Sequence, residues 1–340
     1  MILAHAGPLP IIGRMTNGLV AVQAFFILSG FYMTLVLCEK YNDIKQFYWN
    51  RASRIFSGYW LALPIAIIFG QLAGQDLISA IVCSNWDFGT KLLMLVANVF
   101  IVGSDAMMFV YPGTSGLTFT ANFQDHAVKL YQYHYLAAAW SLPVEFLFYL
   151  LAPFVARSVP KLVALASISL LIRLLTYAIF GEKDPWTYRF FPNELLLFMA
   201  GALSYHVTRY MTRFKLPNYA GNSAFILLII CIVFYKFIFD NLTWPFYLLL
   251  LAAIPFIFLH NGGISSRFDQ AAGEIAYMVY LVHMIVLNNV PALTGIKITP
   301  FITIVLTIII STPLHALAKI IDHRMRSARR ILFQNGAIEN

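Results

Sequence analysis

Charge is what this sequence has least of. Only 11% of its 340 residues are Asp, Glu, Lys or Arg, whereas 60% are hydrophobic. Soluble domains carry about 25% charged residues, so this composition excludes an ordinary soluble globule. Apolar runs long enough to cross a bilayer recur between residues 18 and 321. Helices satisfy their backbone hydrogen bonds within lipid, and the sequence therefore predicts an all-α, polytopic transmembrane helical bundle.

Cysteine is also rare, with three residues in the chain. Cys38, Cys83 and Cys231 lie in or beside apolar segments and show no paired spacing. That spacing argues against a disulfide framework and against a thiolate metal site. His126 and His134 lie eight residues apart, without a third ligand type at a useful spacing. We therefore expect no bound metal.

Acidic residues are outnumbered by basic ones, and the formal net charge is +8 at pH 7. A nucleic-acid partner could explain such an excess, but here the cations gather in short clusters at the ends of the apolar runs. The clusters occupy residues 40–54, 157–161, 209–215 and 324–330. Basic loops of this kind stay on the cytoplasmic side of a membrane. We expect a multi-pass protein of the cell (inner) membrane, without a nucleic-acid partner, in which residues 1–323 form the membrane domain and residues 324–340 a basic cytoplasmic tail.

Nine apolar segments are interpreted as complete spans. They cover residues 18–37, 55–70, 137–154, 162–180, 194–207, 224–239, 244–259, 275–290 and 300–320. Residues 78–103 are apolar but interrupted by polar residues, and the basic clusters alternate correctly only if this stretch makes no net crossing. It must then be re-entrant or cross twice.

The first five residues, MILAH, are apolar but too short to span a membrane. One interpretation is that they end a truncated first helix whose beginning precedes this sequence. The alternative is a free N-terminus at the surface. In the first case, the expected orientation puts His5 on the outer side.

One carboxylate, Glu145, interrupts the third complete span near its start. Pro143 is tolerated in a first helical turn and disfavoured deeper in, so we expect the helix to begin near Ser141 or Leu142. Glu145 then lies about one turn in, with Ser141 and Tyr149 four residues away on the same face. The positive end of the helix dipole could account for this carboxylate. An ionisable group inside an apolar span more often faces a bundle interior or cavity, so Glu145 is a functional candidate.

Six stretches of the chain recur together, in the same order, in one known family. They are His5; GLVAVQAFFILSGF at 18–31; RASR at 51–54; WSLPVEFLFY at 140–149; FMAGA at 198–202; and IAYMVYLVH at 275–283. With them the chain resembles acyltransferase family 3, the integral-membrane O-acyltransferases that include O-antigen, exopolysaccharide and Nod-factor acetylases. There are departures from the family pattern. The arginine that the family carries upstream of the histidine falls outside this sequence, Ala21 replaces a glycine, and Phe146 replaces a second acidic residue.

The resemblance implies an O-acyltransferase, in the first instance an O-acetyltransferase. It would move an acyl group from cytoplasmic acyl-CoA (acetyl-CoA) to a hydroxyl of a cell-surface polysaccharide or lipid-linked saccharide. His5 would be the base that takes the hydroxyl proton, and Glu145 would orient the imidazolium or bind the acceptor's hydroxyls. Arg51 and Arg54, three residues apart on one helical face, would hold the phosphates of the donor. Without the family, positive-inside anchoring would be the simpler interpretation of these arginines.

Further residues are expected to bind substrate or to support the site. They are Ser29, Trp140, Ser141, Tyr149, Tyr280 and His283. His283 follows Tyr280 at helical spacing in an apolar span, where a hydrogen-bonded core histidine is an equally good interpretation. Trp140, Trp186 and Trp244 stand at span starts and are most simply interfacial anchors.

A proton-coupled transporter or flippase is the alternative from another functional class. Glu145 and His283 would then form a proton relay. The sequence shows no matched pair of broken helices, which would mark the inverted repeats of many such transporters. The motifs therefore favour the enzyme.

Overall fold

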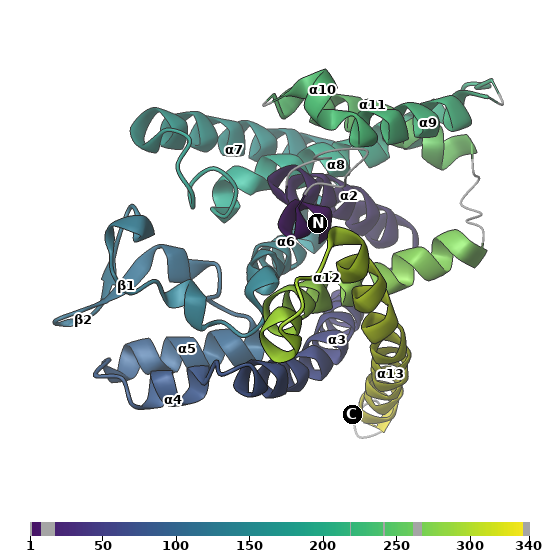
Figure 1. Ribbon diagram of the computed structural model, residues 1–340. Coiled ribbons are helices and arrows are strands. Elements are labelled where there is room, and N and C mark those ends of the chain that lie inside the picture. The colour runs from purple at the N-terminus through teal and green to yellow at the C-terminus, as the bar shows by residue number, and fades with distance from the viewer. Residues whose placement is uncertain (1, 8–17, 218, 241, 261–266, 336–340) are drawn as a thin grey trace. The chain divides into compact units, whose positions relative to one another are not determined.

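The computed structural model describes residues 2–7, 18–217, 219–240, 242–260 and 267–335. It is 77% helical, with 3% strand. Figure 1 shows coiled ribbons along nearly the whole chain and one small hairpin, β1 and β2. The predicted all-α class is confirmed, as expected for a chain whose apolar runs must satisfy their own backbone hydrogen bonds.

The α-helices vary in length from five to 36 residues. They are α1 (Ile2–Ala6), α2 (Gly18–Glu39), α3 (Ile44–Leu72), α4 (Leu77–Val82), α5 (Phe88–Phe100), α6 (Ser141–Val155), α7 (Val159–Phe180), α8 (Phe191–Met211), α9 (Ala220–Val233), α10 (Tyr235–Phe239), α11 (Trp244–His260), α12 (Arg267–Thr294) and α13 (Pro300–Asn335). The strands β1 (Val110–Gly113) and β2 (Gly116–Phe119) pair antiparallel. Short 3-10 helices lie between residues 106 and 140.

Among the described residues, six helices are long and apolar enough to cross a membrane. They are α2, α3, the helical stretch Ala137–Val155 that includes α6, α7, the part of α12 from Gly273, and α13. Three other predicted spans also form helices. α9 and α11 have 14 and 17 residues, fewer than the ~20 that cross the hydrocarbon core. α8 has 21 residues and carries Glu194 and Arg209 in its first and last turns.

Helix α6 begins at Ser141, as predicted, with Pro143 in its first turn. The missing N–H of a proline costs nothing in the first turn, where that donor has no intrahelical partner.

At the other end of the chain, α13 runs unbroken from Pro300 to Asn335. The residues expected to form the start of the basic tail, from residue 324, therefore continue the helix that begins in the expected membrane domain.

Residues 78–103 form two short helices. α4 has six residues and α5 has 13, whereas two separate crossings would need about 20 apolar residues each. Neither helix alone is long enough to cross the hydrocarbon core, and a re-entrant path for this segment stays a prediction. α5 packs on the loop that follows it, through a cluster in which every side chain is at most 1% exposed. The cluster consists of Met94, Ala97, Met107 and Leu130.

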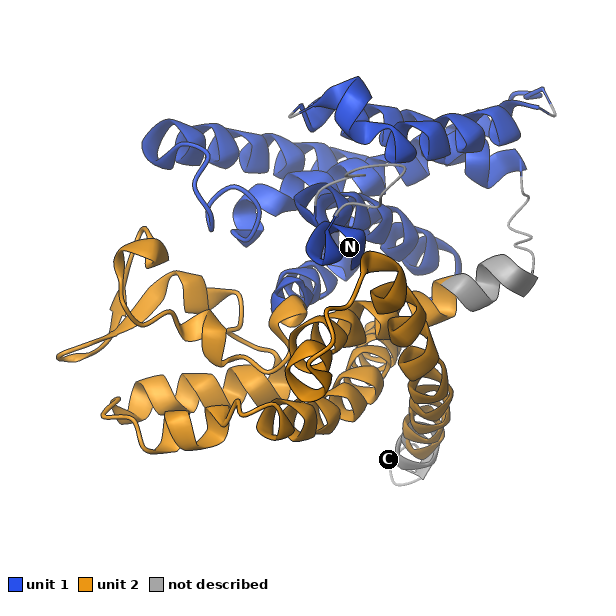
Figure 2. Ribbon diagram, viewed as in Figure 1, with its two compact units in different colours: residues 1–42, 140–270 blue, residues 43–139, 271–340 orange. Residues whose placement is uncertain are grey.

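The chain divides into two compact units, coloured separately in Figure 2. Unit 1 comprises Met1–Asn42 and Trp140–Gln270, and unit 2 comprises Asp43–Ala139 and Ala271–Asn340. Each unit therefore joins two stretches that lie far apart in the sequence. Hydrophobic patterning along the chain cannot reveal this division.

Unit 1 is built around the contact between α2 and α8, and two glycines let these helices approach closely. A Cβ atom added at Gly30 would meet the backbone carbonyl of Phe198, and one added at Gly201 would meet that of Ile27. Small residues serve this purpose in membranes, where packing rather than water exclusion holds helices together. Phe148 of α6 stacks on Phe198, with 4.4 Å between the ring centroids. This contact packs α6 against α8.

Gly30→Val and Gly201→Val are each expected to destabilise the protein. The added branched side chain would force the two backbones apart, and overpacking of this kind costs about 1–3 kcal/mol. The measurement is the melting temperature of detergent-purified protein, read by size-exclusion chromatography after heating. Gly273→Ala is the control, because a Cβ there meets no atom within 4 Å. A Gly201→Val protein as stable as this control would contradict the close contact.

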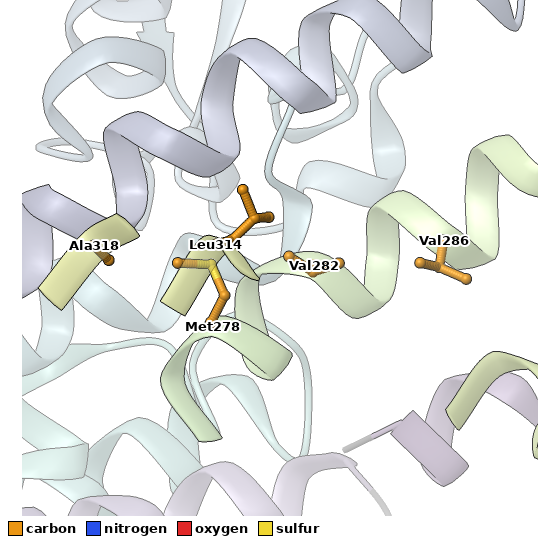
Figure 3. Packing of buried hydrophobic residues seen from close by; sticks show 5 residues of the cluster. All are labelled: Met278, Val282, Val286, Leu314 and Ala318. Atoms are coloured by element: carbon orange, nitrogen blue, oxygen red, sulfur yellow. The ribbon is translucent and has the colours of Figure 1, made fainter. Parts of the chain in front are cut away.

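Unit 2 contains α3, α13 and the part of α12 from Ala271 onward. Figure 3 shows side chains of its hydrophobic cluster, which come from α12 and α13: Met278, Val282, Val286, Leu314 and Ala318. Gly58 of α3 leaves room for the Tyr277 ring, and the Tyr277 hydroxyl donates to the carbonyl of Ile55 at 2.9 Å. Ser53 of α3 donates to Asp322 of α13 at 2.6 Å. The first turns of α3 therefore lie beside the later turns of α13.

Candidate functional site

Glu145 lies near the start of α6, and two hydroxyl groups hold its carboxylate. The side chain is buried, with 5% of its residue surface exposed. Ser29 of α2 donates to Oε1 at 3.1 Å, and Tyr149 donates to the same oxygen from the next turn of α6. The structure thus brings together three of the residues that the sequence marked. Two donors on one oxygen hold the carboxylate in a single orientation, which a group that positions a substrate or a base requires.

The start of α6 is anchored by the loop between α7 and α8. The guanidinium of Arg189 stands 4.1 Å from the ring centre of Trp140, and Tyr188 makes an edge contact with the same ring at 5.3 Å. Asp184 accepts hydrogen bonds from Tyr188 at 3.0 Å and from Arg189 at 2.8 Å. Burial raises the pKa of Tyr188 to about 12, so its hydroxyl remains a donor at neutral pH. Ser141 is buried beside this anchor, at the first position of α6.

His5 lies in α1, within unit 1, and its side chain is exposed. α1 has five residues, in keeping with an apolar stretch too short to span. An accessible imidazole suits a base that must reach a substrate hydroxyl. The pairing of His5 with Glu145 stays a prediction.

Arg51 and Arg54 both lie in the first three turns of α3, in unit 2. Arg54 is exposed. The guanidinium of Arg51 stands 5.9 Å from the ring centre of Phe47, and its buried Nε has no hydrogen-bond partner among the described residues. A buried cationic donor without an acceptor is costly. It marks a place where an anion would be stabilised.

Arg54 also lines a pocket of about 220 Å³ in unit 2. The basic and acidic side chains that line it are Arg54, Lys319, Arg326, His315, Glu274 and Asp322. Lys319 pairs with Glu274 at 2.9 Å, and Arg326 pairs with Asp322 at 2.6 Å. Arg54 adds a further positive charge to these two pairs. A pocket with surplus positive charge fits a phosphate-bearing ligand.

Tyr280 and His283 lie together on α12, in unit 2. Nδ1 of His283 is 2.6 Å from the backbone carbonyl oxygen of Tyr280, so this nitrogen donates within its own helix. The Tyr280 hydroxyl donates to the carbonyl of Ala138. His283 is fully buried. These contacts fit a hydrogen-bonded core histidine, and a role in catalysis stays a prediction.

The structure contains a second buried carboxylate, Glu194 of α8, which is not among the functional residues that the sequence pattern predicts. It is 0% exposed, pairs with Arg173 of α7 at 3.3 Å, and accepts from the amide of Gln23 at 3.0 Å. Tyr247 of α11 donates to the other end of the Gln23 amide. The network joins α2, α7, α8 and α11. The network could have been predicted from the sequence in the same way as Glu145, because Glu194 and Arg173 are ionisable residues inside apolar spans.

The basic clusters of unit 1 meet at one of its ends. Arg157, just beyond α6, donates to the carbonyl of Leu37 at 2.7 Å and to that of Tyr41. Arg209, in the last turn of α8, pairs with Glu39 at 3.4 Å. These contacts lie where α2 ends, whereas the buried carboxylate network lies near its start. A helix of 22 residues separates its ends by about 33 Å.

The two loop histidines have separate surroundings. His126 stacks on Tyr111 with 3.6 Å between ring centroids, and Nε2 of His134 lies 3.2 Å from the carbonyl oxygen of Ala97. Burial lowers the pKa of His134 to about 4, so the ring is neutral at pH 7. The stability that the buried neutral ring of His134 contributes is lost as the pH falls from about 6.5 toward about 4.

Within the described part of the chain, no group of three or more His, Cys, Asp or Glu side chains is placed to hold a metal ion.

Comparison with known proteins gives one finding. The family model described as "Acyltransferase domain" matches residues 1–318, a range that contains Glu145, Arg51 and Arg54. No curated protein and no solved structure gives a match.

Proposed function

Because this chain belongs to the acyltransferase-domain family, we propose that it is an O-acetyltransferase acting between acetyl-CoA and a hydroxyl of a surface or lipid-linked saccharide. Acyltransferase activity follows from the family match over residues 1–318. A membrane location follows from the six long apolar helices among the described residues. The observation that carries the proposal is the buried Glu145 carboxylate, held by Ser29 and Tyr149 inside an apolar unit. The family match also favours an enzyme over a transporter.

The donor is proposed to bind at the pocket beside Arg54. Coenzyme A carries several phosphates, and guanidinium groups bind phosphate through paired, charge-assisted hydrogen bonds. Support comes from the surplus positive charge of the pocket and from the unpartnered Nε of Arg51. The same basic residues belong to the clusters that the positive-inside rule assigns to the cytoplasmic side, where acetyl-CoA is made.

The acyl transfer itself is proposed to use His5 and Glu145. Because the charge pattern assigns the donor's phosphates to the cytoplasmic side and His5 to the outer side, the thioester arm of the donor must extend through part of the membrane. As the acceptor hydroxyl attacks the thioester carbonyl, His5 takes its proton, an O–C bond forms and the C–S bond breaks. The departing CoA thiolate then receives that proton. Glu145 stabilises the imidazolium in a medium of low dielectric, or it holds the acceptor's hydroxyls.

The proposed function is tested with purified protein, radiolabelled acetyl-CoA and surface polysaccharide from the cells that carry the protein. Mild alkali first removes the ester-linked acyl groups from this polysaccharide, so that its hydroxyls are free. We expect label to appear in the polysaccharide and free CoA to appear in step with it. Uptake of label into vesicles without any acylated product would favour the transporter instead.

Arg51→Gln together with Arg54→Gln is expected to raise the KM for acetyl-CoA by about tenfold to a hundredfold for each arginine that contacts a phosphate. Each lost charge-assisted hydrogen bond to phosphate costs about 1.5–3 kcal/mol. The measurement is the KM for acetyl-CoA at saturating polysaccharide, with insertion checked in parallel. Arg213→Gln is the matched control, because Arg213 is an exposed member of another basic cluster, in unit 1. A double variant that keeps its KM but inserts with inverted topology would leave anchoring as the only role of these arginines.

A further inference from the structure

Unit 1 contains a cavity of about 280 Å³ that is separate from the residues proposed for catalysis and donor binding. Its walls come from the start of α2, the end of α7 and the loop after it, the start of α8 and the start of α11. Among the side chains that line it are Gln23, Arg173, Thr187, Asn193 and Trp244. The volume is close to the lower limit of small-ligand sites, ~300 Å³, and suits one small unit rather than a whole cofactor.

One wall of the cavity is polar and held rigidly. Gln23 and Arg173 belong to the Glu194 network. Asn193, 1% exposed, donates from Nδ2 to Thr176 at 2.7 Å and to the carbonyl of Trp186 at 2.8 Å. Its Oδ1 has no hydrogen-bond partner within the described part of the chain. A buried acceptor without a donor is costly, and a ligand hydroxyl is the kind of group that would satisfy it.

Another part of the wall is aromatic and open. Trp244 is 43% exposed, and the Arg173 guanidinium stands 5.0 Å from its ring centre. An indole ring offers a flat apolar face, and sugar rings present apolar C–H faces between their hydroxyls. A ligand that needs both a flat apolar surface and fixed amide and guanidinium partners is therefore a good fit.

The charge of this cavity differs from that of the donor pocket. Arg173 is the basic residue of the lining, and Glu194 already compensates it at 3.3 Å. Glu182 adds a negative charge at the exposed edge. An anionic ligand such as coenzyme A would meet this carboxylate without a free cation, so the cavity disfavours it. A neutral, hydroxyl-rich ligand meets no such penalty.

The position of the cavity connects it to Glu145. Gln23 precedes Ser29 by six residues on α2, a rise of about 9 Å along the helix axis. Ser29 donates to Glu145. We propose that the cavity is an acceptor subsite that binds a neutral sugar unit of the saccharide while a neighbouring unit lies at Glu145. This biological role rests on the proposed function, whereas saccharide binding itself does not need acyl transfer.

The test is equilibrium binding without acetyl-CoA. The probe is a set of end-labelled oligosaccharide fragments of the de-O-acylated surface polysaccharide, and binding to full-length purified protein is read by fluorescence anisotropy. Trp244→Leu is expected to weaken binding roughly tenfold, and Thr187→Val, which removes a hydroxyl from the lining, several-fold. Trp244→Phe keeps an aromatic face and should restore most of the affinity. Phe237→Leu is the matched control, because Phe237 is an 83% exposed aromatic residue of α10 in the same unit and outside the cavity lining.

Two results would overturn the subsite. One is equal binding by wild type and by Trp244→Leu and Thr187→Val, provided that their melting temperatures are unchanged. The other is a wild-type protein that binds none of the fragments. If the fragments bind as expected but no acetyl group is ever transferred, the subsite is supported and the proposed function fails. The two ideas can therefore fail independently.

Discussion

Glu145→Gln is expected to lower the rate of acetyl transfer at least about a hundredfold while the protein stays folded and inserted. The glutamine carbonyl can still accept the hydrogen bonds of Ser29 and Tyr149, so the variant keeps the local shape and loses the charge. Positioned acid–base groups contribute roughly 10²- to 10⁴-fold. The measurement is the initial rate of transfer from radiolabelled acetyl-CoA to the de-O-acylated polysaccharide.

Glu39→Gln is the matched control for this experiment. Glu39 is also a carboxylate of unit 1, but it lies at the end of α2, where it pairs with the exposed Arg209. If His5 and Glu145 share one proton-transfer step, the loss in a His5→Ala, Glu145→Gln double variant should be little greater than in the worse single variant. Strictly additive losses would show that the two residues do not act in one shared step. Near-normal turnover of Glu145→Gln would exclude an electrostatic role for its carboxylate.

Arg173→Met is expected to lower the free energy of unfolding by about 3–5 kcal/mol, because it leaves the Glu194 carboxylate buried without its counter-charge. Glu194 is 0% exposed, and the Arg173 side chain is 17% exposed. Adding Glu194→Gln to Arg173→Met should recover most of the loss, since the remaining groups of the network are then all neutral. The measurement is denaturant unfolding in mixed micelles.

Arg209→Gln provides the comparison for the Arg173 experiment. It breaks an ion pair whose side chains are 64% and 42% exposed, and exposed pairs contribute about 0–1 kcal/mol. If Arg173→Met cost no more than Arg209→Gln, the buried pair would add little to stability. The Glu194 network would then have to be explained by ligand binding alone.

Local features of this protein were predictable because their causes are local. Pro143 restricts the first turn of a helix, and α6 does begin at Ser141. Residues 78–103 carry too many polar interruptions for an unbroken span, and they form the short helices α4 and α5. The pairing of Glu145 with Tyr149 follows from a separation of four residues on one helix. In each case the residues that decide the outcome are near neighbours in the chain.

The contacts between helices were not predictable in the same way. Ser29 and Glu145 lie 116 residues apart, and Gln23 and Glu194 lie 171 apart. Apolar residues surround a membrane helix on all sides, so its sequence gives little indication of which face meets a neighbour. Gly30 and Gly201 are visible in the sequence as small residues. The sequence does not show that a Cβ atom added at either glycine would meet the backbone of the other helix. This close approach follows only from the packing of α2 against α8.

The sequence by itself determined that this chain is a helical membrane protein of an acyltransferase family and that Glu145 is a candidate for its chemistry. Hydropathy, charge clusters and short motifs carry this information, since each depends on residue type and spacing alone. Only the tertiary structure decided which residues surround that carboxylate, that Arg54 lines a basic pocket, and that Arg173, Asn193 and Trp244 border a separate cavity. The physical reason is that a cavity is the space left between helices distant in the chain, and its shape depends on how closely their side chains let them pack.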